Sequence, residues 1–207
     1  MIKKIAAITL AGMMTVGTLQ AQSTSTSSYG SNILRLAPIS VTDMGVGFGL
    51  SYEKILGKEQ KVGIIFPFAL LLEEGYYYDP MNNYNGKRYN SYFNFQPGVK
   101  IYPFGQRKVT YAVGTSLSFT YGGGSEWESS WDPGFSRQID FTRFRIGMLV
   151  NNYVNFQITQ SFNLGLEAGL GMAYYDMTRR NDGISTSTYN EGFNVIGQFA
   201  MTIGYRF

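Results

Sequence analysis

The last nine residues of the chain constrain its fold most strongly. Large apolar or aromatic side chains alternate there with small or polar ones, and the final residue is aromatic. The large side chains are Phe199, Met201, Ile203, Tyr205 and Phe207, and between them stand Ala200, Thr202, Gly204 and Arg206. A period of two residues puts the two sets on opposite faces of a β-strand. Because a bare apolar strand promotes aggregation in water, this pattern argues against an ordinary soluble protein.

The start of the chain has the features of an export signal. Lys3 and Lys4 precede an apolar stretch at residues 5–19, and Ala21 closes a small-residue cleavage site. We therefore predict a signal peptide at residues 1–21, a flexible Ser- and Thr-rich lead-in at 22–30 and one barrel domain at 31–207. A retained anchor helix is the alternative, but its apolar stretch is shorter than the roughly 20 residues that span a bilayer. With no Cys, the chain is not a lipoprotein.

The composition excludes several classes of protein. Removing Lys3 and Lys4 from the 17 basic residues leaves 15 against 14 acidic ones, so a basic charge is no argument for nucleic-acid binding. Disulfides are impossible without Cys, and no His is present to act as a general base. No run of 18 apolar residues follows the signal peptide, so a helical membrane protein is excluded while a strand barrel remains allowed.

Eight segments with period two predict an all-β fold, an eight-stranded antiparallel up-and-down transmembrane β-barrel. The segments are residues 31–39, 45–54, 61–71, 92–102, 109–121, 139–156, 162–175 and 192–207. The intervals between them are short at 55–60, 103–108 and 157–161, and long at 72–91, 122–138 and 176–191. Short periplasmic turns and long extracellular loops are typical of outer-membrane barrels. We expect the last strand to close the sheet by pairing with the first near Leu34 and Leu36.

A soluble lipocalin-like barrel would show the same period with an apolar interior, so the direction of each face must be decided. The face opposite the apolar one is rich in Gly, Ala, Ser and Thr. Small side chains suit the crowded lumen of an eight-stranded barrel, whereas a soluble exterior is rich in Lys and Glu. Aromatic residues, Tyr92 and Tyr102 among them, gather near the strand ends, where interfacial girdles are expected. These observations favour lipid on the outside.

Charged residues within the strands predict a network in the lumen. Arg143 and Arg145 share one face, and an Arg that faces lipid at the midplane costs about 2–4 kcal/mol. The predicted network consists of Arg35, Glu53, Lys100, Arg143, Arg145, Glu167 and Arg206. Because buried charges need partners, we expect Glu53 and Glu167 to meet some of the five cations.

The mature chain resembles a known family over its whole length. The resemblance rests on the run Pro97-Gly98-Val99-Lys100-Ile101-Tyr102-Pro103-Phe104-Gly105, on Gly165-Leu166-Glu167-Ala168-Gly169-Leu170-Gly171 and on the terminal strand. These are similar to small eight-stranded outer-membrane barrels of the OmpA-like and OmpX-like class. The resemblance implies a monomer in the bacterial outer membrane, surrounded by its lipids. It also implies that the barrel-assembly machinery, with periplasmic chaperones, reads Phe199, Met201, Ile203, Tyr205 and Phe207 as an assembly signal.

No motif for catalysis, metal binding or cofactor binding stands out. Outer-membrane enzymes rely on a His as general base or dyad member, and the chain has none. Glu53 and Glu167 could form a catalytic carboxylate pair, but lumen ion pairs are the preferred interpretation. Two acidic groups in the loops could gather Ca²⁺, although neither has the spacing of a known calcium loop: Glu73, Glu74 and Asp79, and Glu126, Glu128 and Asp132.

The long loops carry the remaining functional signal. Candidate binding aromatics are Tyr76, Tyr77, Tyr78, Tyr84, Trp127 and Trp131. Such side chains favour binding surfaces, although they could instead pack the loops. Asn85-Gly86 and Asp182-Gly183 are turn signals, which suggests hairpins above the membrane. We predict a structural or surface-binding role that the extracellular loops carry. The alternative is a narrow porin or carrier for small or hydrophobic solutes.

Overall fold

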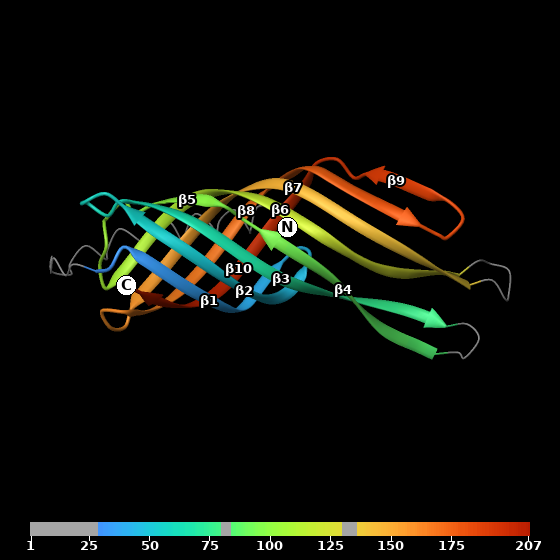
Figure 1. Ribbon diagram of the computed structural model, residues 1–207, viewed down its shortest axis with the longest axis horizontal. Coiled ribbons are helices and arrows are strands. Elements are labelled where there is room, and N and C mark those ends of the chain that lie inside the picture. Colours follow the sequence, from blue (N-terminus) through green and yellow to red (C-terminus); the bar gives the residue numbers. More distant parts are fainter. Residues whose placement is uncertain (1–28, 80–83, 130–135) are drawn as a thin grey trace, which may run out of the picture.

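The computed structural model describes residues 29–79, 84–129 and 136–207 (Figure 1). Over these residues the chain forms β-strands only: β1 (Asn32–Thr42), β2 (Gly45–Leu56), β3 (Val62–Asp79), β4 (Tyr84–Phe95), β5 (Gly98–Ile101), β6 (Val109–Ser129), β7 (Ser136–Gln157), β8 (Phe162–Asn181), β9 (Thr186–Asn190) and β10 (Asn194–Arg206). Within these three ranges, no helix is long and apolar enough to cross a membrane.

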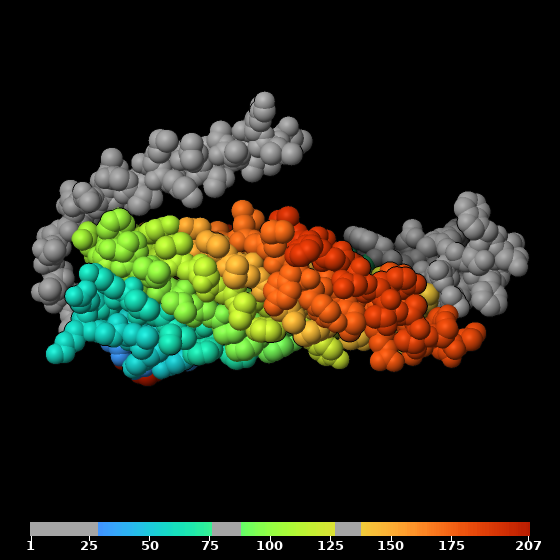
Figure 2. Space-filling view, turned by 90° about the horizontal axis from the view of Figure 1, so that it is seen from above, coloured from blue at the N-terminus to red at the C-terminus, as the bar shows by residue number. Residues whose placement is uncertain are grey.

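The strands form one closed antiparallel barrel. The sheet order is β10-β1-β2-β3-β4-β6-β7-β8, and β10 also pairs with β8, which closes the ring. Because β5 continues β4 between β3 and β6, the described residues form eight barrel-spanning strands, which we call staves. Leu34 pairs with Tyr205 and Leu36 with Ile203, as expected from the sequence. The predicted fold class is therefore confirmed. Figure 2 shows the staves packed side by side, from β3 and β5 (cyan to green) across β6 to β8 (orange).

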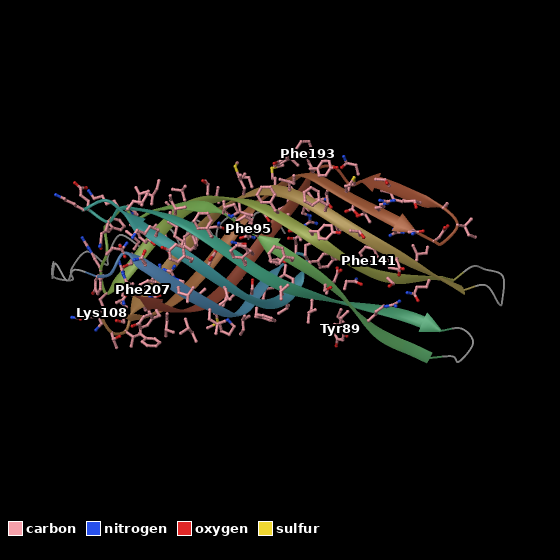
Figure 3. The ribbon with its side chains drawn as sticks, in the orientation of Figure 1. Tyr89, Phe95, Lys108, Phe141, Phe193 and Phe207 are labelled. Carbon is pink, nitrogen blue, oxygen red and sulfur yellow. The ribbon has the colours of Figure 1, made fainter. Side chains whose placement is uncertain are left out.

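Alternation divides the side chains between the exterior and the lumen. The five large residues of the terminal stripe, four on β10 and Phe207 directly after it, are 43–58% exposed, whereas Thr202, Gly204 and Arg206 are buried. Figure 3 shows side chains projecting outward along the length of the barrel. The barrel is apolar outside and largely polar inside, which is the reverse of a soluble protein and fits immersion in lipid.

Prolines interrupt two strands that the sequence pattern treats as regular. The register of β1 shifts near Pro38 against both β2 and β10. The predicted strand 92–102 is divided into β4 and β5 at Gln96-Pro97. Proline has no N–H to donate to the ladder. Hydrogen bonds from Gln96 N to Pro67 O (3.0 Å) and from Leu117 N to Pro97 O (3.0 Å) carry the sheet across this break.

The long intervals continue as hairpins at the end of the barrel opposite the C-terminus (Figure 1). Pairing of β3 with β4 reaches Asp79 and Tyr84, and β8 pairs with β9, a strand that the sequence pattern did not predict. The predicted turn at Asn85-Gly86 is wrong, because these residues lie in β4 opposite Tyr78 and Tyr77. The predicted turn at Asp182-Gly183 is confirmed: Gly183 has φ of 82° and Asp182 N donates to Ser185 O.

The two ends of the barrel domain meet at the short-turn end. Asn32 N donates to Phe207 O at 3.0 Å, and Phe207 N donates to Asn32 O at 2.9 Å. An even number of staves places both ends on the same side of the membrane. The predicted signal peptide (1–21) and residues 22–28 of the predicted lead-in lie outside the described residues, so both stay predictions.

Candidate functional site

A cluster of buried charges occupies the lumen near the short-turn end. Glu53 on β2 accepts hydrogen bonds from Arg35 on β1 and from Lys100 on β5, the latter at 3.0 Å between Nζ and Oε2. The Tyr102 hydroxyl donates to the other carboxylate oxygen of Glu53. Arg35 is 3%, Glu53 0% and Lys100 1% exposed. Strand alternation aims all three charged side chains inward, Arg35 and Glu53 from adjacent strands and Lys100 from β5 on the far side of β3, so one carboxylate balances two cations.

Apolar and aromatic side chains complete this layer of the lumen, which we call the inner plug. Lys100 Nζ lies 3.8 Å from the ring centroid of Tyr153, a cation–π contact. Ile33, Ile55, Tyr102, Ala112 and Tyr153 pack together as a buried cluster around the charges. The prediction that Tyr102 belongs to an exterior girdle is wrong. Its side chain points into the lumen, where its hydroxyl donates to Glu53. The lumen of an eight-stranded barrel is just wide enough for side chains to fill it.

The middle of the lumen holds Glu167, on β8. It accepts a hydrogen bond from Gln198 Nε2 at 2.7 Å, and Gln198 also donates to Asn151 Oδ1 at 2.9 Å. Among the described residues Glu167 forms no ion pair, so its predicted pairing with a cation is not found. Glu167 lines a cavity of about 40 Å³ together with Ser51, Gln96 and Thr202. Such a volume has room for a few water molecules, and its walls offer them polar partners.

A second charged cluster lies at the hairpin end of the lumen. Arg143 on β7 binds Asp176 on β8 through two hydrogen bonds, of 2.7 and 2.6 Å, and reaches Glu191 at 2.6 Å. Arg145 donates to Asp176 at 2.9 Å and to Asp43, on the turn between β1 and β2. Asp176 is completely buried. The Arg143–Asp176 contact is bidentate, a geometry that makes an arginine–carboxylate pair strong and directional.

The acidic partners in this cluster were missed at the sequence level. The pattern ends the seventh predicted strand at Tyr175, which assigns Asp176 to a loop. In the structure β8 continues to Asn181, and the register against β7 shifts between Ile146 and Gly147. The irregularity inserts one residue near Tyr174 and reverses the alternation, so that Asp176 points inward. The sequence signal that could have revealed Asp176 is its position one residue after the predicted end of the strand.

An apolar layer lies beside these ion pairs. Met44, from the short turn between β1 and β2, is buried with Leu71, Tyr92 and Phe141. Tyr92 was also predicted in an exterior girdle and instead points inward, where its hydroxyl donates to Glu73 Oε2 at 2.9 Å. Together, the ion pairs of Arg143 and Arg145 and the Met44 cluster form the outer plug.

Arg206 lies at the short-turn floor of the lumen, apart from both plugs. Its Nε donates to the carbonyl oxygen of Gly30 and its Nη1 donates to Gln106 Oε1 at 3.0 Å. No carboxylate pairs with it in the described part of the chain. The seven charged residues predicted as one network therefore lie in separate places: the inner plug, the Glu167 cavity, the outer plug and the floor.

The outer hairpins carry the candidate binding aromatics. Tyr76, Tyr77 and Tyr78 lie on β3, Tyr84 on β4 and Trp127 on β6, but their side chains are not described. Trp131 lies outside the described residues. The side chains that are described include exposed apolar groups near the same end: Tyr89 (Figure 3), Ile184 at 91% exposure and Tyr189. Over these residues, no group of three or more acidic side chains is placed to hold a metal ion.

Comparison with known proteins shows similarity at the level of fold. No protein-family model matches the sequence, and no curated protein matches it. A major outer membrane protein from Thermus thermophilus is 11% identical, with a TM-score of 0.60 over 85% of this chain and 99% of that one. Outer membrane protein OprG from Pseudomonas aeruginosa is 10% identical, with a TM-score of 0.55 over 86% and 97%. Outer membrane protein AlkL, solved in lipid bilayers, is 7% identical, with a TM-score of 0.54 over 91% and 96%.

These matches agree with the geometry of the barrel itself. A closed ring of eight antiparallel staves, apolar outside and polar inside, is the architecture of the small outer-membrane β-barrels. The chain therefore has the fold of the small outer-membrane β-barrels.

Proposed function

We propose that this outer-membrane barrel neither conducts solutes nor catalyses a reaction, and that its role is structural or surface-binding and is carried by the outer hairpins. The observation that supports this most directly is that two clusters of buried side chains, the inner and outer plugs, lie in the lumen. The inner plug surrounds Glu53 and the outer plug surrounds Asp176, and the cavity near Glu167 holds only about 40 Å³ between them. A hydrated ion needs a continuous path, and the buried, paired side chains of the two plugs argue against one.

The hairpins are the part of the protein best able to meet a partner outside the cell. Three of them extend β3–β4, β6–β7 and β8–β9 beyond the closed lumen (Figure 1). Tyr89, Ile184 and Tyr189 expose apolar surface there. Tyr side chains give large contact area at low entropic cost, and this supports a binding role for an extracellular ligand. Beneath the hairpins, lipids of the outer membrane surround the barrel. The sheet closes within one chain, so a monomer is sufficient to form the barrel.

The absence of catalysis is supported by the chemistry of the buried groups. The chain has no His. Glu53 and Asp176, the two most enclosed carboxylates, are each bound by two basic side chains, which favours a structural role. A narrow conduit for small solutes is the second candidate, because polar side chains, among them Ser51, Gln96 and Glu167, line part of the cavity between the plugs.

Single-channel recording separates these two functions. In a planar bilayer the purified protein should give no steady current, since both plugs hold charged side chains in ion pairs. A variant whose β3–β4 hairpin is shortened above Glu74 should also be silent, because Asp43 and Met44 lie below the cut. A general porin serves as the positive control. Stable openings of the unmodified protein would favour the conduit instead.

We also propose that the terminal stripe of Phe199, Met201, Ile203, Tyr205 and Phe207 is the signal that the barrel-assembly machinery reads after periplasmic chaperones deliver the chain. Support comes from the exposure of the whole stripe on β10 and from the pairing of β10 with both β1 and β8 at the closure of the barrel.

Replacing Phe207 with alanine should lower the amount of folded barrel in cells severalfold while leaving the stability of the refolded protein nearly unchanged. Phe207 is exposed, and its ring stacks against that of Tyr205 at 6.2 Å between centroids. Phe162→Ala is a matched control, because Phe162 is similarly exposed and lies 5.7 Å from the same ring but belongs to β8. Heat-modifiable gel mobility of outer-membrane fractions measures the folded share. Equal losses in both variants would contradict an assembly signal.

A further inference from the structure

Two neighbouring periplasmic turns are joined at the short-turn end of the barrel. The first connects β2 to β3 at residues 57–61, and the second connects β5 to β6 at residues 102–108. Tyr102 N donates to Lys61 O at 2.7 Å, and Gln106 Nε2 donates to Gln60 O at 3.3 Å. These bonds hold the two turns side by side on the rim.

The joined turns carry an excess of positive charge. Lys61 pairs with Glu59 at 2.7 Å, and this contact lowers the pKa of the Glu59 carboxyl. Lys58, Arg107 and Lys108 form no ion pair with any described residue, and we call these three the basic rim patch. The turn between β7 and β8, residues 158–161, contains no charged residue. The charge is therefore concentrated on one side of the rim.

The patch lies next to the apolar exterior of the barrel. Leu56 precedes Lys58 by two residues, and Phe104 precedes Arg107 by three; both apolar side chains are exposed, as is Ile101 at the end of β5. Lys108 lies at the same end of the barrel as Phe207 (Figure 3). Side chains that follow the last lipid-facing ring by two or three residues lie at the depth of lipid headgroups, where cations and interfacial aromatics are found together.

We propose that the basic rim patch binds the phosphate groups of anionic phospholipids in the periplasmic leaflet. Lys58 and Lys108 supply compact ammonium groups, and Arg107 offers a guanidinium that can bind two phosphate oxygens. The exposed apolar side chains of Leu56, Ile101 and Phe104 lie next to the patch and can contact acyl chains. A phospholipid therefore binds both the cations and the apolar surface, whereas a soluble acidic partner would bind the cations alone. The inference is independent of whether the lumen conducts.

Lipid selectivity at the protein boundary tests this proposal. The full mature protein is reconstituted in phosphatidylcholine bilayers that contain a trace of spin-labelled phosphatidylglycerol or, in parallel, spin-labelled phosphatidylcholine. Electron spin resonance then gives the relative association of the two labels. We expect a roughly threefold preference for phosphatidylglycerol that weakens in high salt. The triple variant K58Q, R107Q and K108Q should show no preference.

The control removes two positive charges at the other end of the barrel. Arg179 and Arg180 lie on the outer part of β8, and the double variant R179Q and R180Q should retain the preference. Heat-modifiable gel mobility verifies that each variant is folded. An unchanged preference in the triple variant would overturn the proposal, as would the lack of any preference in the unmodified protein. Binding of inorganic phosphate that the triple variant loses, together with no lipid preference in the unmodified protein, would assign the patch to free anions and also overturn the proposal.

Discussion

Replacing Glu53 with leucine should lower the free energy of unfolding by about 3–5 kcal/mol, because the substitution leaves Arg35 and Lys100 buried without a counter-charge. It also removes the acceptor of the Tyr102 hydroxyl. For a domain with about 5–15 kcal/mol of stability, this is the largest single-residue loss that we expect in the lumen. Reversible denaturant unfolding in detergent micelles, followed by tryptophan fluorescence, measures it.

Two variants make this prediction specific to the ion pairs. Glu53→Leu combined with Lys100→Met should recover part of the loss, since only one cation then lacks a partner. Glu59→Leu, which removes an exposed carboxylate from the rim, should leave stability unchanged within error. If Glu53→Leu unfolded at the same denaturant concentration as the unmodified protein, the inner plug would not stabilise the barrel through charge pairing.

The second large effect concerns the lipid-facing surface. Leu170 lies within the outward row of β8 that runs from Phe162 to Tyr174, and it is the most exposed apolar side chain of that strand, at 67%. Leu170→Arg should cost about 2–4 kcal/mol in a bilayer, because an arginine near the midplane must leave water. Unfolding from lipid vesicles, in which the bilayer is intact, measures this cost.

The same substitution at the end of the strand provides the matched control. Phe162 also faces outward but lies beside the short turn, so Phe162→Arg should cost about 0–1 kcal/mol after correction for the lost side chain. A soluble barrel would show no such difference, since an added surface arginine would be tolerated at either position. Equal, small costs at both positions would contradict a membrane-spanning belt.

Period-two alternation predicted the number of staves, their approximate positions and the direction of each face. This worked because a strand that separates lipid from a crowded lumen must alternate at nearly every residue. The pattern could not predict the register change near Pro38 or the break at Pro97. Both depend on whether the proline, which has no N–H, stands at a position that would donate a hydrogen bond to the neighbouring strand. It also ended the outer strands too early, because above the membrane no lipid face enforces the alternation.

The candidate site was only partly predictable. Alternation assigned Arg35, Glu53 and Lys100 to the lumen, but the choice of partners depends on stagger between staves that are far apart in the sequence. Arg145 thus meets Asp43, 102 residues away, while Glu167 bonds to Gln198. Asp176 escaped prediction because the register shift near Tyr174 reverses which side of β8 faces inward.

The sequence by itself determined that this chain forms a membrane-spanning β-barrel, because the apolar stripe, the Gly-rich opposite face and the unequal loop lengths are local properties of the chain. The tertiary structure alone decided that buried side chains gather in two separate plugs in the lumen, and that Lys58, Arg107 and Lys108, which form no ion pair with any described residue, lie on one side of the barrel rim. The physical reason is closure: barrel stagger sets which inward side chains meet, and no local pattern encodes it.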